Sequence, residues 1–140
     1  MFEKILLAVD GSDHALHAAK LAGDLARQMN TKRVRIVIAF DPVPFYLGEP
    51  DLQIVINARL KESQKILQDA RESVGEISGE VHTELIEGSP AEAIIETAKT
   101  RQSDLIVMGS RGLGRIAGAV LGSTSQKVVA HAPCPVLIVR

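Results

Sequence analysis

Five of the eleven glycines in this chain fall in one short stretch, directly before a run of three hydroxyl side chains. The glycines are Gly109, Gly112, Gly114, Gly118 and Gly122, and the hydroxyls are Ser123, Thr124 and Ser125. A glycine-rich loop brings backbone N–H groups close to an anion, and a helix that starts after it adds unpaired N–H groups and a positive dipole end. This stretch is therefore predicted to bind phosphate.

The charges around this stretch also favour an anion. From Gly109 to Cys134 there is no Asp or Glu, whereas Arg111, Arg115 and Lys127 carry positive charge. The whole chain is nearly neutral, with a formal net charge of -1 at pH 7. We therefore expect a positive field at the loop alone. The scattered charge elsewhere argues against nucleic acid as a partner, because binding a polyanion needs a pronounced basic patch.

Five short runs rich in Val, Ile and Leu are predicted to be strands, at residues 4–9, 34–40, 81–87, 105–108 and 136–139. Their apolar residues are continuous, which is typical of parallel strands covered on both faces. Helical patterns lie between them. Strict alternation of strand and helix predicts an α/β fold with a parallel sheet, helices on both faces and a ligand crevice at the carboxyl ends of the central strands.

Each predicted helix has its own sequence signal. The first follows Ser12 or Asp13 as a cap and carries alanines at helical spacing, and the second has an apolar stripe of Ile56, Leu60, Leu67, Ala70 and Val74. The third opens with a cap, a proline and a capping-box glutamate in Ser89-Pro90-Ala91-Glu92. The fourth is expected to begin near Ser123 and end before Pro133, with Val128 and Val129 inward. Residues 41–51 predict a long loop at the crevice end.

The composition predicts one domain, spanning residues 1–140, with a core built from small aliphatic side chains. Hydrophobic residues make up 46% of the chain, but aromatic residues only 3%. The single cysteine, Cys134, has no partner for an intramolecular disulfide, so a reducing compartment is expected and no chemistry is assigned to it. The N-terminus lacks a signal-peptide pattern, and no apolar run approaches the roughly 20 residues that span a bilayer. We expect a cytoplasmic protein.

Two common phosphate motifs are absent. The Walker pattern fails because Ser123, not lysine, follows Gly122, and the dinucleotide fingerprint fails because Asp10-Gly11-Ser12 follows the first strand. The stretch does match G-x-x-G, nine residues, then G-[ST], from Gly109-Ser110-Arg111-Gly112 to Gly122-Ser123. With Ile5-Leu6-Leu7-Ala8-Val9-Asp10-Gly11-Ser12 at one end and Cys134-Pro135-Val136-Leu137-Ile138-Val139 at the other, essentially the whole chain resembles the universal stress protein family.

This resemblance implies the ATP-binding branch of the family, because the spaced glycine motif is specific to that branch. It also implies a Rossmann-like, flavodoxin-like sheet of strand order 3-2-1-4-5, with Mg²⁺ held mainly through the nucleotide phosphates. It places Gly88 on the rim of the site. The nucleotide-binding residues that it implies, together with the phosphate loop, are Ala8, Val9, Asp10, Ala39, Met108, Gly109, Arg111, Gly112, Gly122, Ser123, Thr124, Ser125 and Val136.

Several of these residues also have a plainer interpretation. Asp10 either accepts hydrogen bonds from ribose or adenine, or it has a structural role, in which it caps the first helix or braces the turn at Gly11. Ala8, Val9 and Ala39 form an apolar floor for adenine or are ordinary strand residues. Met108 is a ligand contact or a core filler.

His14 and His17 lie three residues apart on the first helix. Because no Cys or acidic cluster completes a set of ligands, we assign no protein-built metal site.

The function expected from these features is that of an ATP-binding regulatory module of the stress response, with slow or no hydrolysis, since the phosphate loop offers no carboxylate as a general base. No catalytic residue is assigned. The alternatives are an adenylating or weakly ATP-hydrolysing enzyme of a related α/β family, a phosphoryl-accepting receiver and a scaffold without nucleotide. The family's strand order leaves residues 136–140 at a sheet edge, so we also expect a homodimer through that strand.

Overall fold

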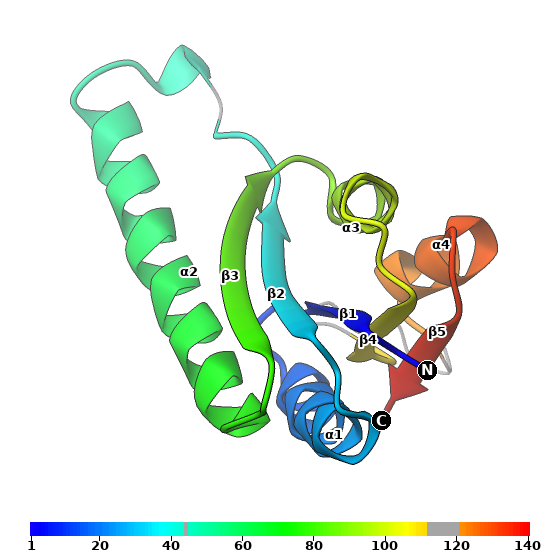
Figure 1. Ribbon diagram of the computed structural model, residues 1–140. Coiled ribbons are helices and arrows are strands. Elements are labelled where there is room, and N and C mark those ends of the chain that lie inside the picture. Colours follow the sequence, from blue (N-terminus) through cyan, green and yellow to red (C-terminus); the bar gives the residue numbers. More distant parts are fainter. Residues whose placement is uncertain (44, 112–120) are drawn as a thin grey trace.

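Five parallel strands lie at the centre of the fold, in the order β3-β2-β1-β4-β5 (Figure 1). The computed structural model describes residues 1–43, 45–111 and 121–140. Each hydrogen-bonded pair of strands is parallel, and β1 lies between β2 and β4. The fold is a single α/β domain, and the strand order implied by the family resemblance is confirmed.

All nine predicted helices and strands are present among the described residues. The strands are β1 (Lys4–Ala8), β2 (Arg33–Phe40), β3 (Glu80–Glu87), β4 (Leu105–Gly109) and β5 (Val136–Val139). The helices are α1 (Asp13–Met29), α2 (Asp51–Val74), α3 (Pro90–Thr100) and α4 (Ser123–His131), with a short 3-10 turn, η1 (Phe45–Leu47). No helix in the described ranges is long and apolar enough to cross a membrane.

Helices α1 and α2 cover one face of the sheet, and α3 and α4 cover the other (Figure 1). On the first face Leu7 and Ile36 are fully buried against the alanines of α1, whose small side chains allow the helix to pack close to the strands. On the second face Leu6 and Ile106 are fully buried against α3 and α4. Each such side chain contributes about 1.5–3 kcal/mol by leaving water.

The structure corrects three details of the helices. Ser89 makes no side-chain capping bond at the start of α3, so the predicted capping box does not form and Pro90 is the remaining start signal. Val129 is 49% exposed, because only its neighbour Val128 faces the core. The buried residues of α2 all lie in its second half, whereas Leu60 is 38% exposed. The apolar stripe of α2 therefore packs on the sheet only from Ser63 onward.

The close packing of α1 against α2 depends on Gly23. A Cβ atom at this position would overlap the carbonyl oxygen of Val74 at the end of α2 and lie 2.9 Å from its carbonyl carbon. Replacing a helical glycine by alanine normally stabilises a helix by about 1 kcal/mol. Here we predict the opposite: Gly23→Ala lowers the free energy of unfolding by about 1–2 kcal/mol, because overpacking outweighs the gain.

Chemical denaturation measures this effect, with Lys20→Ala on the exposed face of the same helix as the control. The control is expected to stay within about 0.5 kcal/mol of the parent protein. A Gly23→Ala variant that is more stable than the parent would contradict the packing described here.

Candidate functional site

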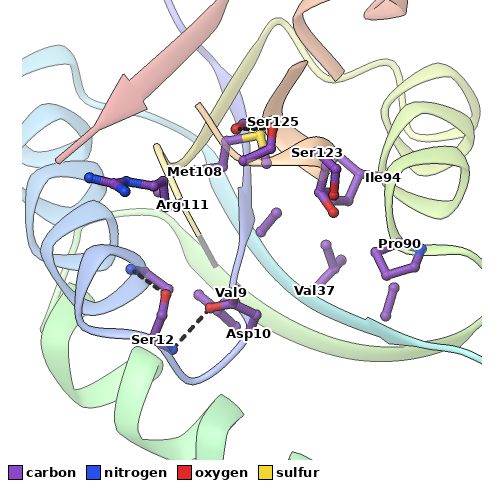
Figure 2. Close-up of a pocket in the computed structure, with 16 residues that line it drawn as sticks. Val9, Asp10, Ser12, Val37, Pro90, Ile94, Met108, Arg111, Ser123 and Ser125 are labelled. Carbon is purple, nitrogen blue, oxygen red and sulfur yellow. Dashed lines mark hydrogen bonds between the residues drawn. The ribbon is translucent and has the colours of Figure 1, made fainter. Parts of the chain in front are cut away.

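A cavity of about 220 Å³ opens where β1, β2 and β4 end (Figure 2). Residues from the starts of α1, α3 and α4 complete its walls. Parallel strands place their carboxyl ends at one edge of the sheet, and helices that begin there surround the opening. The crevice predicted at this edge is therefore present.

The floor of the cavity is apolar and made of small side chains. Ala8 comes from the end of β1, Val37 and Ala39 from β2, and Met108 from β4. Val37 and Ala39 are two residues apart on one strand and so point to the same face of the sheet. In Figure 2, Pro90 and Ile94 of α3 lie on one side of this floor. The short side chains leave room for a flat apolar group.

The first turn of α4 forms another wall, and in Figure 2 its Ser123 lies beside Ile94 of α3. Gly122 is its N-terminal cap, with an extended backbone (φ −73°, ψ 168°) and no side chain to bond the helix N–H groups. Gly122, Ser123 and Thr124 line the cavity, and the first turn contains no acidic residue. The first N–H groups of a helix have no acceptor within the helix, so they are available to an anion.

Ser125 has a different role from the other two hydroxyls. It is only 2% exposed, and its Oγ lies 2.8 Å from the carbonyl oxygen of Ser110 and 3.1 Å from that of Gly122, so the two acceptors share its single proton. All three residues line the cavity, but the hydroxyl of Ser125 holds the start of α4 in place, which leaves the hydroxyls of Ser123 and Thr124 for a ligand.

Ser110, which follows β4, joins several elements at the rim of the cavity. Its N–H donates to Val139 O (2.7 Å), and its carbonyl accepts from Gly122 N (2.8 Å) as well as from Ser125. Its Oγ lies 2.8 Å from His14 Nδ1, and the two atoms share a hydrogen bond. We call this group, Ser110 with His14, Gly122, Ser125 and Val139, the Ser110 junction. It connects β4, β5, α1 and α4.

Close packing against His14 requires a glycine at position 109. A Cβ atom there would lie 2.8 Å from His14 Cβ and 3.0 Å from the His14 carbonyl carbon. A side chain at this position would push β4 away from the start of α1. Gly109 lines the cavity as predicted, but its lack of a side chain is required by the helix behind it.

Asp10 lines the cavity and braces the turn before α1 at the same time. Its Oδ1 accepts a hydrogen bond from Ser12 N (2.9 Å), and Ser12 Oγ in turn accepts from Ala15 N (3.2 Å) as the cap of α1 (Figure 2). Gly11 between them has φ +88°, which glycine adopts without strain. Asp10 therefore braces the turn at Gly11, as one structural interpretation predicts, whereas the cap of α1 is Ser12 and not Asp10. Asp10 also lines the cavity.

Arg111 also lines the cavity. In Figure 2 its guanidinium group points away from Ser123 and Val37.

The structure brings most of the predicted site residues together. Those that line the cavity are Ala8, Val9, Asp10, Ala39, Met108, Gly109, Arg111, Gly122, Ser123, Thr124 and Ser125. Gly112 lies outside the described residues. Val136 is not at the cavity, because it pairs with Ile106 near the start of β4 and packs into the core. Gly88 is not among the lining residues, and its N–H bonds Phe40 O at the end of β2.

Sequence reasoning missed five lining residues: Ser12, Ala15, Val37, Pro90 and Ile94. Because alternate residues of a strand point to the same face, the prediction of Ala39 at the site could have been extended to Val37. The helical spacing of four would have paired Ile94 with Pro90, but only once α3 was known to border the site.

Cys134 and the histidines do not form a reactive centre in the described residues. Burial raises the pKa of the Cys134 thiol, and the Asp104 carboxylate raises it further, against a smaller lowering by a hydrogen bond with the Ile106 backbone. This environment disfavours the thiolate. Within the described residues, no group of three or more His, Cys, Asp or Glu side chains is placed to hold a metal ion.

Comparison with known proteins agrees with the fold. The model of the universal stress protein family matches residues 1–140. The Thermus aquaticus protein named "Universal stress protein in QAH/OAS sulfhydrylase 3'region" is 49% identical over 140 residues, which cover 100% of both chains. Universal stress protein UspA from Lactobacillus plantarum has a similar structure, with a TM-score of 0.87 at 28% identity, covering 99% of this chain and 98% of that one.

A universal stress protein solved in complex with cAMP is also similar in structure. It gives a TM-score of 0.76 at 28% identity, covering 99% of this chain and 97% of that one. Sequence, fold and these similarities agree over the full length, and the chain belongs to the universal stress protein family.

Proposed function

We propose that this protein binds ATP in the cavity, with adenosine on the apolar floor and the phosphates at the first turn of α4. The observation that carries this proposal is that the floor and the uncapped helix start face one cavity. A nucleotide has the same two parts, a flat base and an anionic tail. Pre-formed pockets commonly pair an apolar lining with a few placed polar groups in this way.

Each wall has a separate task in this proposal. Ala8, Val37, Ala39 and Met108 contact the base, and Asp10 accepts hydrogen bonds from the ribose hydroxyls. The N–H groups of the first turn of α4, with the hydroxyls of Ser123 and Thr124, bind phosphate oxygens. Mg²⁺ enters with the nucleotide, because a hard cation is held by phosphates, water and one or two carboxylates rather than by a protein cage.

The similarity to a universal stress protein in complex with cAMP supports an adenine nucleotide as the ligand class. ATP is favoured over cAMP by the spaced glycine pattern of the sequence from Gly109 to Gly122, which resembles the motif of the ATP-binding branch of the family. cAMP, which carries one phosphate, is the second candidate, and titrating both nucleotides separates the two.

We propose a regulatory role in the cytoplasm rather than rapid catalysis. Asp10 is the one acidic residue among the described residues that line the cavity, and its Oδ1 is already engaged by Ser12 N. A general base needs to reach the attacking water, and a carboxylate that braces a turn is poorly suited to move there. Binding of ATP then acts through stability or assembly.

ATP is expected to stabilise the folded protein by mass action, by about 2.7 kcal/mol at 100 times its dissociation constant. Gly122→Val is expected to abolish this effect, because Gly122 lines the cavity at the start of α4 and a branched side chain there would occupy the space that the phosphates need. The fold should persist, since the extended backbone of Gly122 (φ −73°) accommodates valine. Thermal unfolding with and without millimolar Mg-ATP measures both. An unchanged melting temperature of the parent protein, or equal stabilisation of the variant, would contradict the proposed site.

The three hydroxyls of α4 give a second, internally controlled test. Ser125→Ala removes a buried hydroxyl with two acceptors, so we expect the free energy of unfolding to fall by about 1 kcal/mol. Ser123→Ala removes an exposed hydroxyl at the cavity, so stability stays the same and ATP binding weakens several-fold. Denaturation and calorimetric titration of both variants are needed. Lower stability of Ser123→Ala together with weaker ATP binding by an otherwise stable Ser125→Ala would contradict these roles.

We also propose that the protein forms a homodimer through β5. This strand lies at one edge of the sheet and is entirely apolar, from Val136 to Val139. The other edge, β3, carries ion pairs with its neighbour β2, Arg33 with Glu80 and Arg35 with Glu84, both at 3.2 Å. Charges protect an edge strand from pairing with another chain, and β5 lacks them. Antiparallel pairing of two β5 strands about a two-fold axis perpendicular to them closes the assembly.

The hydrogen bonds of β5 show which backbone groups face outward. Ile106 N donates to Pro135 O (3.0 Å) and Ser110 N to Val139 O (2.7 Å), so the odd-numbered residues face β4. Because alternate residues of a strand bond to the same side, Val136 and Ile138 present their N–H and C=O groups to the free edge.

Ile138→Pro is therefore expected to yield a folded monomer, because it removes an outward donor and leaves the pairing with β4 intact. Thr83→Pro is the matched control on the opposite edge, where Glu80 and Gly88 bond to β2 and Thr83 faces outward. It is expected to remain a dimer. Sedimentation at tens of micromolar, with circular dichroism as the check on folding, measures both. A parent protein that sediments as a monomer both with and without ATP would refute the dimer.

A further inference from the structure

A serine and a histidine at hydrogen-bond distance require an explanation. Ser110 Oγ and His14 Nδ1 are 2.8 Å apart although they are 96 residues apart in the chain. The same pair of side chains forms nucleophilic dyads in hydrolases. Here Ser110 is 3% exposed and is not among the residues that line the cavity, so a substrate has no access to its hydroxyl. The His14 ring stacks on that of His17, at 6.4 Å between centroids, and among the described hydrogen bonds none joins the imidazole to a carboxylate.

The contact instead satisfies a buried hydroxyl at a critical place. Ser110 and Gly122 stand at the two ends of the glycine-rich segment, and Gly122 N donates to Ser110 O at 2.8 Å. Ser110 thus sets where α4 begins. His14 is the side chain that bonds the Ser110 hydroxyl from the α1 side, and a buried hydroxyl without a partner is costly.

We propose that His14 is a positioning residue of the nucleotide site: through Ser110 it fixes the first turn of α4, to which the phosphates bind. This inference rests on the proposed function for its ligand. The path has two bonds, from His14 Nδ1 to Ser110 Oγ and from Ser110 O to the N–H of Gly122. Gly109 adds a steric contact, because its missing side chain lets the backbone of β4 lie directly against His14.

His17 is the natural comparison. It lies on the same helix, and its Nδ1 also contacts a distant segment, the carbonyl oxygen of Arg140 at 3.1 Å. That contact reaches the end of β5 and bypasses Ser110. His17 is exposed and His14 is partly buried, so His17→Leu shows whether loss of a polar contact between α1 and a distant segment is by itself enough to disturb the site.

The experiment replaces each histidine by leucine, which keeps the bulk and removes the polar ring, and tests rescue by His14→Asn. Asparagine places a polar atom close to the position of the imidazole Nδ1. Two readouts are taken: hydrogen exchange of the Gly122 and Val9 amides in the nucleotide-free protein, and ATP affinity by calorimetry. Val9 N, which donates to Val37 O at 2.9 Å on the base side of the cavity, is the internal reference.

For His14→Leu we expect exchange of the Gly122 amide and the dissociation constant for ATP each to rise about tenfold, as for the loss of one hydrogen bond. Val9 exchange should not change. His14→Asn should restore most of the exchange protection of the Gly122 amide and most of the ATP affinity, and His17→Leu should leave both unchanged.

Unchanged exchange of the Gly122 amide in His14→Leu, or equal effects of the two leucine variants, would overturn the inference. Faster exchange with unaltered ATP affinity would restrict His14 to a structural role. If the parent protein binds no ATP, the proposed function fails, and with it the role of His14 at a nucleotide site, while the exchange data still test the contact.

Discussion

The polar groups of Ser110 hold four elements together at the rim of the cavity. Its N–H bonds β5, its carbonyl bonds the start of α4, and its hydroxyl bonds α1. Because the residue is buried, each of these bonds is made away from water, where an unpaired group would be costly. The positions of the helix start that faces the cavity and of the edge strand are therefore linked through one residue. If the proposed nucleotide binds at α4 and the proposed dimer forms through β5, this link is the physical route that connects the two.

The Ser110 junction exists because small residues let α1 approach the sheet. The buried alanines of α1 lie on Leu7 and Ile36, and Gly109 leaves space for the His14 backbone at the end of β4. At the other end of α1, Gly23 allows contact with Val74. A core with larger side chains would move the helix outward and separate His14 from Ser110. Small side chains also keep the apolar floor of the cavity open. The same feature of the composition therefore accounts for the close packing of α1 and for the space at the site.

Much of this arrangement could be predicted from local patterns, and the failures have physical causes. Alternation of apolar strands and helices predicted the parallel sheet and the crevice, because both depend on short-range periodicity. The run from Ser123 to Ser125 pointed to the start of α4, but no pattern indicates that Ser125 turns inward to bond Ser110. The family resemblance predicts Val136 at the site, whereas the register of β5 pairs it with Ile106, where it is partly buried against the core and away from the cavity. The contact of His14 with Ser110 joins residues 96 apart and is visible only in three dimensions.

The central claim is that adenine nucleotide binds between the apolar floor and the start of α4. An amide chemical-shift titration of the isotope-labelled protein with Mg-ATP tests it most directly, because every described backbone N–H of the cavity is a separate probe. The largest shifts are predicted at Ser123, Thr124 and Gly122 on the phosphate side and at Val9 and Ala39 on the base side. Saturating ATP without such shifts, or shifts confined to the groove between Gly11 and Lys61 on the other side of Asp10, would contradict the account.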